Sequence, residues 1–139
     1  MPTYRFIKKA GGKTLDQIIA LYEKQGWWRK GDTPELAANI VKNSHCFLLA
    51  LDQGRVIGMG RAISDNASDA YIQDITVLEN RRALGIGSAI VRKLKSRLKA
   101  DGIKWIGLIA QNNSRNFYRK LGFKVITRSH PMMLTGNHV

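Results

Sequence analysis

The sequence predicts a mixed α/β or α+β fold in which flanking helices cover one central sheet. Its second half alternates apolar runs of strand character with amphipathic helical periods, in the order strand, helix, strand, helix, strand. A strand at residues 70–77 and another at 104–110 enclose a helical period, which requires a parallel crossover. Neither a linker nor an internal repeat divides the chain, so we expect one domain over residues 1–139.

The first helix is predicted over residues 14–26, where apolar residues recur at helical spacing. Thr14 and Gln17 have the spacing of a capping box, and Gly26 is a suitable helix stop. The apolar face consists of Leu15, Ile18, Ile19 and Tyr22.

A second helix is predicted over residues 32–44, with Thr33 as its N-cap and Pro34 at its first position. Two apolar runs follow at residues 45–51 and 55–64, and the turn residues Asp-Gln-Gly separate them. This arrangement is typical of a β-hairpin.

The remaining elements are a helix over residues 88–100, a short helix within 113–122 and a final strand at 123–129. Asn113 is the expected N-cap of the short helix, and Gly122 lies just past its end. In the longer helix the expected core face consists of Ile90, Val91, Leu94 and Leu98.

The net charge of +13 is concentrated in the second half of the chain. Residues 1–80 carry ten Lys or Arg against nine acids, whereas residues 81–139 carry thirteen against the single acid Asp101. Such a field attracts phosphates, nucleic acid or anionic membranes, although it also serves solubility.

Several classes of protein are disfavoured by composition. No apolar run approaches the length of a membrane span, and the first residues do not resemble a signal peptide. One cysteine, Cys46, excludes an internal disulfide, and its apolar neighbours place it in a buried strand. We expect a cytoplasmic location, no membrane partner and no metal site.

The segment RRALGIGSAI, residues 81–90, combines positive charge with two glycines where a helix begins. Unpaired amides at a helix N-terminus attract anions, and Gly85 and Gly87 would let a phosphate approach the backbone. Arg81 and Arg82 add charge, so a pyrophosphate is a suitable ligand. An ordinary strand–helix turn is the alternative; the dinucleotide fingerprint and the P-loop fit less well.

Residues 71–94, YIQDITVLENRRALGIGSAIVRKL, resemble the acyl-CoA-binding core of the GNAT superfamily of N-acetyltransferases. A second block at residues 112–123, NNSRNFYRKLGF, resembles another motif of that family in the right order and spacing. The resemblance extends over about residues 45–126. It implies a mixed sheet that splays between its fourth and fifth strands, counting a first strand at residues 3–9.

The resemblance also implies that acetyl-CoA binds in the opening of the sheet. Its pyrophosphate is expected on the glycine turn beside Arg82, and its pantetheine beside the backbone of Ile75 and Val77. Phe117 and Asn113 are further candidate contacts, but Gln111 and Asn112 leave open which amide meets the pantetheine. The turn residues concerned are Leu84, Gly85, Ile86, Gly87 and Ser88.

Two residues are candidates for the proton transfers. The resemblance implies that Tyr118 is the general acid, although it could simply pack beside Phe117. Asp74 is a candidate base; the alternatives are deprotonation through ordered water and a role of Asp74 in fixing the splayed backbone. Strand alternation places Asp74 opposite the face of Tyr71, Gln73, Ile75 and Val77 unless a bulge intervenes.

For the acceptor, Trp27 and Trp28 are expected as exposed aromatics of a pocket lid, with Tyr71 and Gln73 as further contacts. Core packing of the tryptophans is the alternative. The loop acids around Asp65 and Asp69 could attract a cation or merely cap turns. This region resembles plant and cyanobacterial acetyltransferases that act on arylalkylamines, polyamines or protein lysines.

The sequence therefore predicts an acetyl-CoA-dependent transferase that acetylates a primary amine of a small molecule by direct attack in a ternary complex. A protein-lysine or N-terminal acetyltransferase is the alternative within enzymes. A basic nucleic-acid-binding module is a remote alternative, because no recognition motif accompanies the charge. A homodimer is one candidate assembly.

Overall fold

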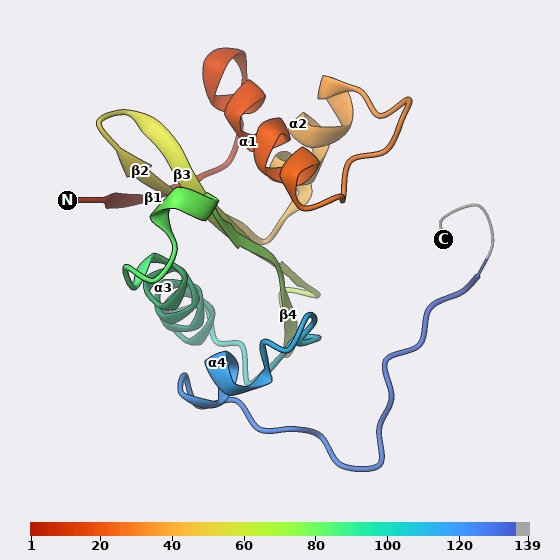
Figure 1. Ribbon diagram of the computed structural model, residues 1–139. Coiled ribbons are helices and arrows are strands. Elements are labelled where there is room, and N and C mark those ends of the chain that lie inside the picture. The colour runs from red at the N-terminus through yellow and green to blue at the C-terminus, as the bar shows by residue number, and fades with distance from the viewer. Residues whose placement is uncertain (136–139) are drawn as a thin grey trace. The chain divides into compact units, whose positions relative to one another are not determined.

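The computed structural model describes residues 1–135. Five strands in these residues form one sheet in the order β1-β2-β3-β4-β5 (Figure 1). Neighbouring strands from β1 to β4 are antiparallel, whereas β4 and β5 are parallel. The predicted hairpin, mixed sheet and parallel crossover are confirmed. The strands are β1 (Thr3–Ile7), β2 (Cys46–Asp52), β3 (Arg55–Ser64), β4 (Asp69–Val77) and β5 (Trp105–Gly107).

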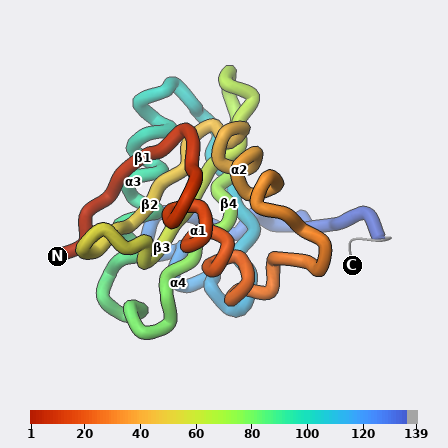
Figure 2. Tube along the Cα trace, turned by 90° about the horizontal axis from the view of Figure 1, so that it is seen from above, coloured from red at the N-terminus to blue at the C-terminus, as the bar shows by residue number. Residues whose placement is uncertain are grey.

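Helices cover both faces of this sheet. Figures 1 and 2 show α1 and α2 on one face and α3 on the other. The helices are α1 (Gly12–Lys24), α2 (Pro34–Asn43), the 3-10 turn η1 (Glu79–Arg81), α3 (Ile86–Ala100) and α4 (Arg115–Arg119). The fully buried side chains that fill the two layers include Ile18, Leu21, Val41, Phe47, Leu49, Ile57, Met59, Ile90, Leu94 and Leu98.

The described chain forms two compact units, one from Met1 to Leu108 and one that begins at Ile109. The first unit contains the whole sheet with α1, α2 and α3, and the second contains α4. Within residues 1–135, no helix has both the length and the apolar character that crossing a membrane requires.

The sheet splays between β4 and β5. Their pairing is confined to three positions, the last of which joins Tyr71 to Gly107, although β4 continues to Val77. The ring of Trp105 contacts Tyr71 edge-on, with 5.1 Å between the ring centroids. A Cβ at Gly107 would overlap that indole ring, so glycine lets Trp105 lie against the sheet here. Beyond Tyr71 the edge of β4 is not paired with β5.

A β-bulge in β4 changes which residues share a face. Thr76 is opposite Met59 and Gln73 is opposite Arg61, so Gly60 faces two residues of β4. Asp74, within the bulge, has a φ of 59°, which is rare for a residue with a side chain. The simple alternation predicted for β4 is therefore wrong: Asp74 joins Gln73 beside Arg61 on the α1 face.

Past the bulge, Ile75 turns to the opposite face. A Cβ at Gly60 would lie 2.5 Å from Ile75 Cδ1 and 2.7 Å from Ile90 Cγ2 of α3. Gly60 therefore allows α3 to pack closely on the sheet at the bulge.

Two predicted helix starts are wrong because backbone conformation, not side-chain capping, begins these helices. The N-cap of α1 is Gly11, so Thr14 and Gln17 form no capping box. Gln17 Oε1 instead accepts the N–H of Val56 at 2.7 Å. The other helix, α3, begins at Ile86 after left-handed Gly85, two residues before the predicted Ser88.

In the second unit, the N-cap of α4 is Ser114 rather than Asn113, whose φ of 62° belongs to the preceding turn. The predicted strand at 123–129 is also wrong, since these residues form neither helix nor strand. Val125 and Ile126 are about half exposed, at 49% and 58%. A strand needs a hydrogen-bonded neighbour as well as apolar residues, and the described sheet ends at β5. The predicted start of α2, with Thr33 at the N-cap position before Pro34, is confirmed, although the Thr33 side chain makes no capping hydrogen bond.

Candidate active site

The turn between β4 and α3 presents unpaired backbone amides. Ala83 and Gly85 both have left-handed conformations, with φ values of 63° and 81°. The first bond of the helix runs from the N–H of Ala89 to the carbonyl of Gly85, at 3.0 Å. Among residues 1–135, no acceptor is found for the amides of 84–88. Successive donors of this kind form an anion-binding concavity at the positive end of the α3 dipole.

The two glycines of the turn have different reasons to be there. Gly85 adopts the left-handed conformation that ends the turn, and glycine adopts it without steric cost. Gly87 lies in the first turn of α3 and does not have a positive φ, so the turn does not require glycine there. What Gly87 contributes is the absence of a side chain beside the unpaired amides.

The two arginines before the turn are engaged differently. Arg81 Nη1 forms an ion pair with Asp52 at 2.6 Å, and this hydrogen bond lowers the pKa of Asp52. Arg82 is exposed, and its Nε donates to the carbonyl of Val77 at 3.1 Å. Arg82 therefore holds the end of β4 while its two terminal nitrogens make no hydrogen bond within residues 1–135.

Asp74 is the centre of a polar network on the α1 face. Its Oδ2 accepts the hydroxyl of Tyr22 at 2.7 Å and Arg61 Nε at 2.6 Å. The terminal nitrogens of Arg61 donate to Ser44 Oγ and Gln73 Oε1, each at 3.3 Å. Both bonds to Asp74 use the same oxygen, so within residues 1–135 Oδ1 has no hydrogen-bond partner. Oδ1 can therefore accept a hydrogen bond from a ligand.

Tyr22 holds this carboxylate through its proton. Burial raises the pKa of Tyr22 far above its usual value, and the adjacent charge of Asp74 raises it further. The hydroxyl therefore stays protonated and donates to Asp74. The sequence placed Tyr22 on the core face of α1 but did not indicate this contact. The available signal was a tyrosine among aliphatic residues, because a buried phenol needs a polar partner.

An aromatic cluster surrounds Tyr22. The ring centroids of Trp27 and Trp28 lie 6.1 Å and 6.3 Å from that of Tyr22. Both tryptophans are half-buried, so the expectation that they are exposed is wrong, whereas their role as a pocket lid stays a prediction. The predicted pair does lie in the neighbourhood of Asp74, since Tyr22 contacts all three residues.

The other predicted acceptor residues of the first unit have separate partners. Tyr71 is 47% exposed and contacts Trp105, whereas Gln73 accepts from Arg61. Asp65 caps its own turn: its Oδ1 accepts three backbone N–H groups, which lower its pKa to about 2. The turn-capping interpretation of Asp65 is therefore confirmed.

In the second unit, Tyr118 lies between two phenylalanines. Its ring centroid is 4.9 Å from that of Phe117 and 5.9 Å from that of Phe123, both edge-on. Burial raises the pKa of Tyr118. A phenol with a raised pKa remains protonated at neutral pH and can donate, but not accept, a proton there.

Cys46 is not suited to nucleophilic catalysis. It is 2% exposed in β2, and burial raises the pKa of its thiol to about 11. Because the thiolate is the reactive form, this cysteine is inert at neutral pH.

The profile of the Acetyltransferase (GNAT) family matches residues 13–123, which include the Asp74 network and the glycine turn. The chain belongs to the GNAT family. Enzymes of this family use acetyl-CoA as the acetyl donor.

Three curated relatives illustrate the range of GNAT proteins that this chain resembles. An N-acetyltransferase from Porphyra purpurea is 38% identical over 78% of this chain and 64% of its own length. A histone acetyltransferase from Glycine max is 37% identical over 86% of this chain and 56% of its own length. A chloroplastic serotonin N-acetyltransferase from Oryza sativa subsp. japonica is 34% identical over 50% of this chain and 35% of its own length. The chain thus spans less than two thirds of the length of these relatives.

A solved structure from meticillin-resistant Staphylococcus aureus, described as a probable acetyltransferase, has the same fold. Its TM-score is 0.81 at 27% identity, and the alignment covers 98% of this chain and 100% of that one. The predicted GNAT fold is therefore confirmed.

Proposed function

We propose that this GNAT protein transfers an acetyl group from acetyl-CoA to a primary amine of a small molecule, by direct attack in a ternary complex. The observation that carries the proposal is a carboxylate with one open oxygen beside an aromatic cluster. Asp74 Oδ1 can accept from an ammonium or amine, and Tyr22, Trp27 and Trp28 offer π-faces near it.

The glycine turn suits the diphosphate of the coenzyme. The unpaired amides of residues 84–88 are directed donors, and Arg82 adds a cation with two available nitrogens. The backbone of Ile75 and Val77, on the part of β4 that is not paired with β5, is the proposed contact for the pantetheine. When bound, acetyl-CoA supplies the activated acetyl group.

Asp74 is better suited to holding the amine than to removing its proton directly. Protonating Asp74 would leave Arg61, 2.6 Å away and 15% exposed, without its counter-ion. We therefore assign Asp74 to orienting the amine, with the proton leaving through water, and direct deprotonation by Asp74 as the alternative. Tyr118 Oη is the proposed donor of the proton that the leaving sulfur takes up.

The aromatic cluster favours an acceptor that combines a cationic amine with an apolar or aromatic part. The name of the rice relative, a serotonin N-acetyltransferase, agrees with such an acceptor. The name of the soybean relative, a histone acetyltransferase, supports protein lysine as the second candidate. That rice protein is named as chloroplastic, so the expected cytoplasmic location stays a prediction.

The experiment is a thiol-release assay with acetyl-CoA and a panel of acceptors: tryptamine, spermidine and a lysine-containing peptide. We expect the highest kcat/KM with tryptamine. A lysine peptide preferred by tenfold or more would replace the small-molecule proposal with the protein-lysine alternative. No acetylation of any acceptor would contradict both.

The coenzyme site is tested separately through Gly87→Val, which places a branched side chain beside the unpaired amides. Because Gly87 does not have a positive φ, the variant is expected to fold but to lose coenzyme A binding at least a hundredfold. The matched control is Ser96→Val, a β-branched substitution on the exposed face of the same helix. Unchanged affinity in Gly87→Val would show that the phosphate site is assigned wrongly.

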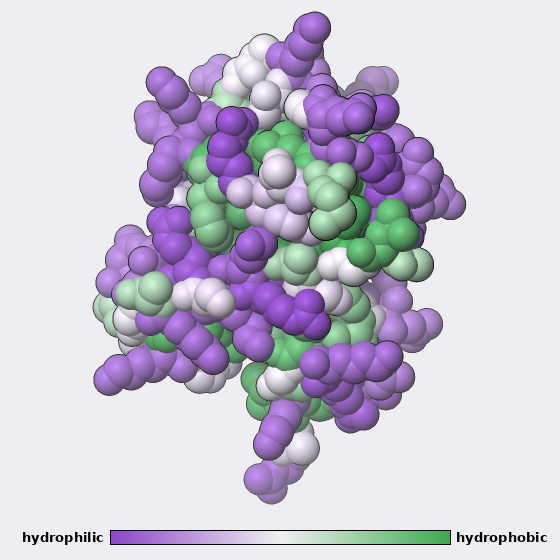
Figure 3. Space-filling model, turned by 90° about the vertical axis from the view of Figure 1, so that its left-hand side faces the viewer, coloured by the Kyte–Doolittle hydropathy of each residue, from purple (hydrophilic) through white to green (hydrophobic). Residues whose placement is uncertain are grey.

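The positive charge of the second half of the chain is the feature that supports the alternative of a nucleic-acid-binding module, which can be tested by its salt dependence. Hydrophilic residues cover much of the face drawn in Figure 3, in keeping with a net charge of +13. We expect coenzyme A to bind at a moderate salt concentration at which duplex DNA no longer does, because non-specific DNA binding weakens steeply with salt. The opposite order would favour the nucleic-acid-binding module.

A further inference from the structure

A polar pocket lies in the first unit, away from the glycine turn. It has a volume of about 460 Å³ and is lined by the C-terminal ends of α2 and α3, the residues just before β2, the end of β3 with the loop after it, and Lys8, which follows β1. Arg97 and Asp101 form its wall at the end of α3. The glycine turn is at the other end of this helix, which spans about 22 Å at 1.5 Å per residue. The pocket is therefore separate from the proposed coenzyme site.

The pocket contains more positive than negative charge. Lys8, Lys42 and Arg97 contribute three permanent cations, and Asp101 is the only acid in the lining. Asp101 is already engaged: its Oδ2 contacts His45 Nε2 at 2.8 Å and Arg97 Nε at 3.0 Å. The hydrogen bond from His45, followed by that from Arg97, lowers the pKa of Asp101, which therefore stays ionised.

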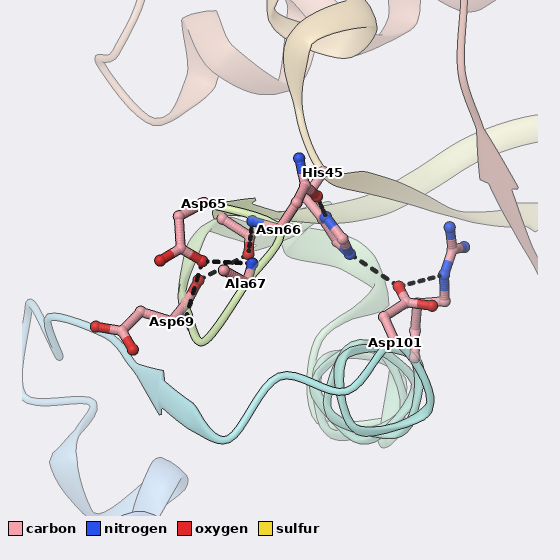
Figure 4. A network of polar contacts seen from close by, with 8 residues as sticks. His45, Asp65, Asn66, Ala67, Asp69 and Asp101 are labelled. Carbon is pink, nitrogen blue, oxygen red and sulfur yellow. Dashed lines mark hydrogen bonds and ion pairs between the residues drawn. The ribbon is translucent and has the colours of Figure 1, made fainter.

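Lys8 and Lys42 have no carboxylate partner among the described residues. The nearby loop does not supply one. Figure 4 shows His45 between Asn66 and Asp101, whereas the carboxylates of Asp65 and Asp69 point away from His45. Two lysines without a carboxylate partner among the described residues thus line the same pocket, which favours a ligand with at least two negative charges.

The wall of the pocket is held in place before any ligand binds. The two ring nitrogens of His45 lie 2.5 Å from Asn66 Oδ1 and 2.8 Å from Asp101 Oδ2, and its side chain is only 12% exposed. The guanidinium of Arg97 lies 4.8 Å from the centroid of the Phe6 ring while its Nε bonds Asp101. The two terminal nitrogens of Arg97 make no hydrogen bond within residues 1–135. The guanidinium is therefore already oriented, and both terminal nitrogens can donate to an oxyanion.

We propose that this pocket binds a small anion that carries phosphate. Phosphate matches the donor set because it has several oxygens in a tetrahedral arrangement and up to two charges per group. The fork of Arg97 can contact two of these oxygens, and Lys8 and Lys42 can neutralise the remaining charge. The amide and hydroxyl groups in the lining supply neutral contacts.

The experiment is calorimetric titration with inorganic pyrophosphate in the presence of saturating coenzyme A, which occupies the glycine turn. We expect one pyrophosphate per chain, and at least tenfold weaker binding in Lys8→Ser/Lys42→Ser. The matched control, Lys13→Ser/Lys24→Ser, removes two exposed lysines of α1 and should change the Kd less than twofold. No binding in the presence of coenzyme A, or equal losses in both variants, would overturn the proposal.

Two further titrations define the chemistry. Citrate carries comparable charge without phosphate and should bind at least tenfold more weakly than pyrophosphate; equal binding would overturn the assignment of phosphate. Titration with ribose 5-phosphate distinguishes a sugar phosphate from inorganic phosphate as the natural ligand of the pocket. Tighter binding of ribose 5-phosphate than of pyrophosphate indicates a sugar phosphate, and weaker binding indicates inorganic phosphate. Amide NMR signals of His45 and Ser44 should shift on binding, and shifts confined to other residues would contradict the location.

Discussion

Replacing Tyr22 with phenylalanine tests the network that holds Asp74. The substitution removes the hydroxyl that donates to Asp74 Oδ2 at 2.7 Å and keeps the ring that contacts Trp27 and Trp28. A hydrogen bond to a charged group contributes about 1.5–3 kcal/mol to stability. Asp74 retains Arg61 and its side chain is 19% exposed, so we expect the lower end of that range, about 1.5 kcal/mol at pH 7.

The contribution of Tyr22 to the free energy of unfolding should fall as the pH rises. The folded-state pKa of Tyr22 is raised above its unfolded value, mainly by burial, so its contribution is fully present below pH 10. Above that pH the unfolded chain releases the Tyr22 proton while the folded chain keeps it. Wild-type protein should therefore lose about 1.4 kcal/mol per pH unit from this group, and Tyr22→Phe should not. The stability difference between the two proteins should shrink from pH 9 to pH 11.

The assay is urea unfolding of both proteins at several pH values, followed by circular dichroism. Tyr71→Phe is the matched control, because the exposed Tyr71 hydroxyl has no hydrogen-bond partner within residues 1–135. It should change the free energy of unfolding by less than about 0.5 kcal/mol at pH 7. If Tyr22→Phe is equally neutral, or if its effect is the same at pH 9 and pH 11, the reasoning about this hydrogen bond is wrong.

Three other outcomes are expected. Gly60→Ala should destabilise the protein by about 1–3 kcal/mol in urea unfolding, and by more than Gly58→Ala. A Cβ at Gly60 would lie 2.5 Å from its nearest neighbouring atom, whereas a Cβ at Gly58 would lie 3.1 Å from its own. A larger loss of stability in Gly58→Ala would contradict this packing. Cys46→Ala should keep its acetylation rate within about twofold, because the thiol is buried and takes no part in the proposed direct attack. Native Cys46 should resist thiol reagents at pH 8, where roughly one thiol in a thousand is ionised at a pKa of about 11. Loss of activity in the variant would instead support Cys46 as a nucleophile that carries the acetyl group. Tyr118→Phe should lower kcat at least tenfold with little change in coenzyme A affinity, and an unchanged kcat at all pH values would reduce Tyr118 to a packing residue.

Local sequence signals were sufficient for most of the fold and for the position of the glycine turn. Apolar patterns placed α1, α2, α3 and the strands β2 to β4 to within a few residues. Each helix buries one apolar face, whereas β2 and β3 are nearly continuous apolar runs bounded by turn residues. The glycines and arginines of residues 81–87 marked the turn because conformations such as that of Gly85 restrict which residues can occupy it. These are properties of short segments, so they are encoded locally.

Tertiary structure alone decided the arrangement around Asp74. Its left-handed bulge, opposite Gly60, turns the carboxylate toward Tyr22 and Arg61, residues far from it in the sequence. The segment 123–129 has apolar residues but no strand, because pairing depends on a neighbour that the segment itself cannot specify. The sequence by itself determined which segments are apolar and where they turn. That the turn after β4 binds a diphosphate stays a prediction. The partners of each strand and each polar side chain were decided only in three dimensions, because a hydrogen bond requires two groups that the chain brings together from distant positions.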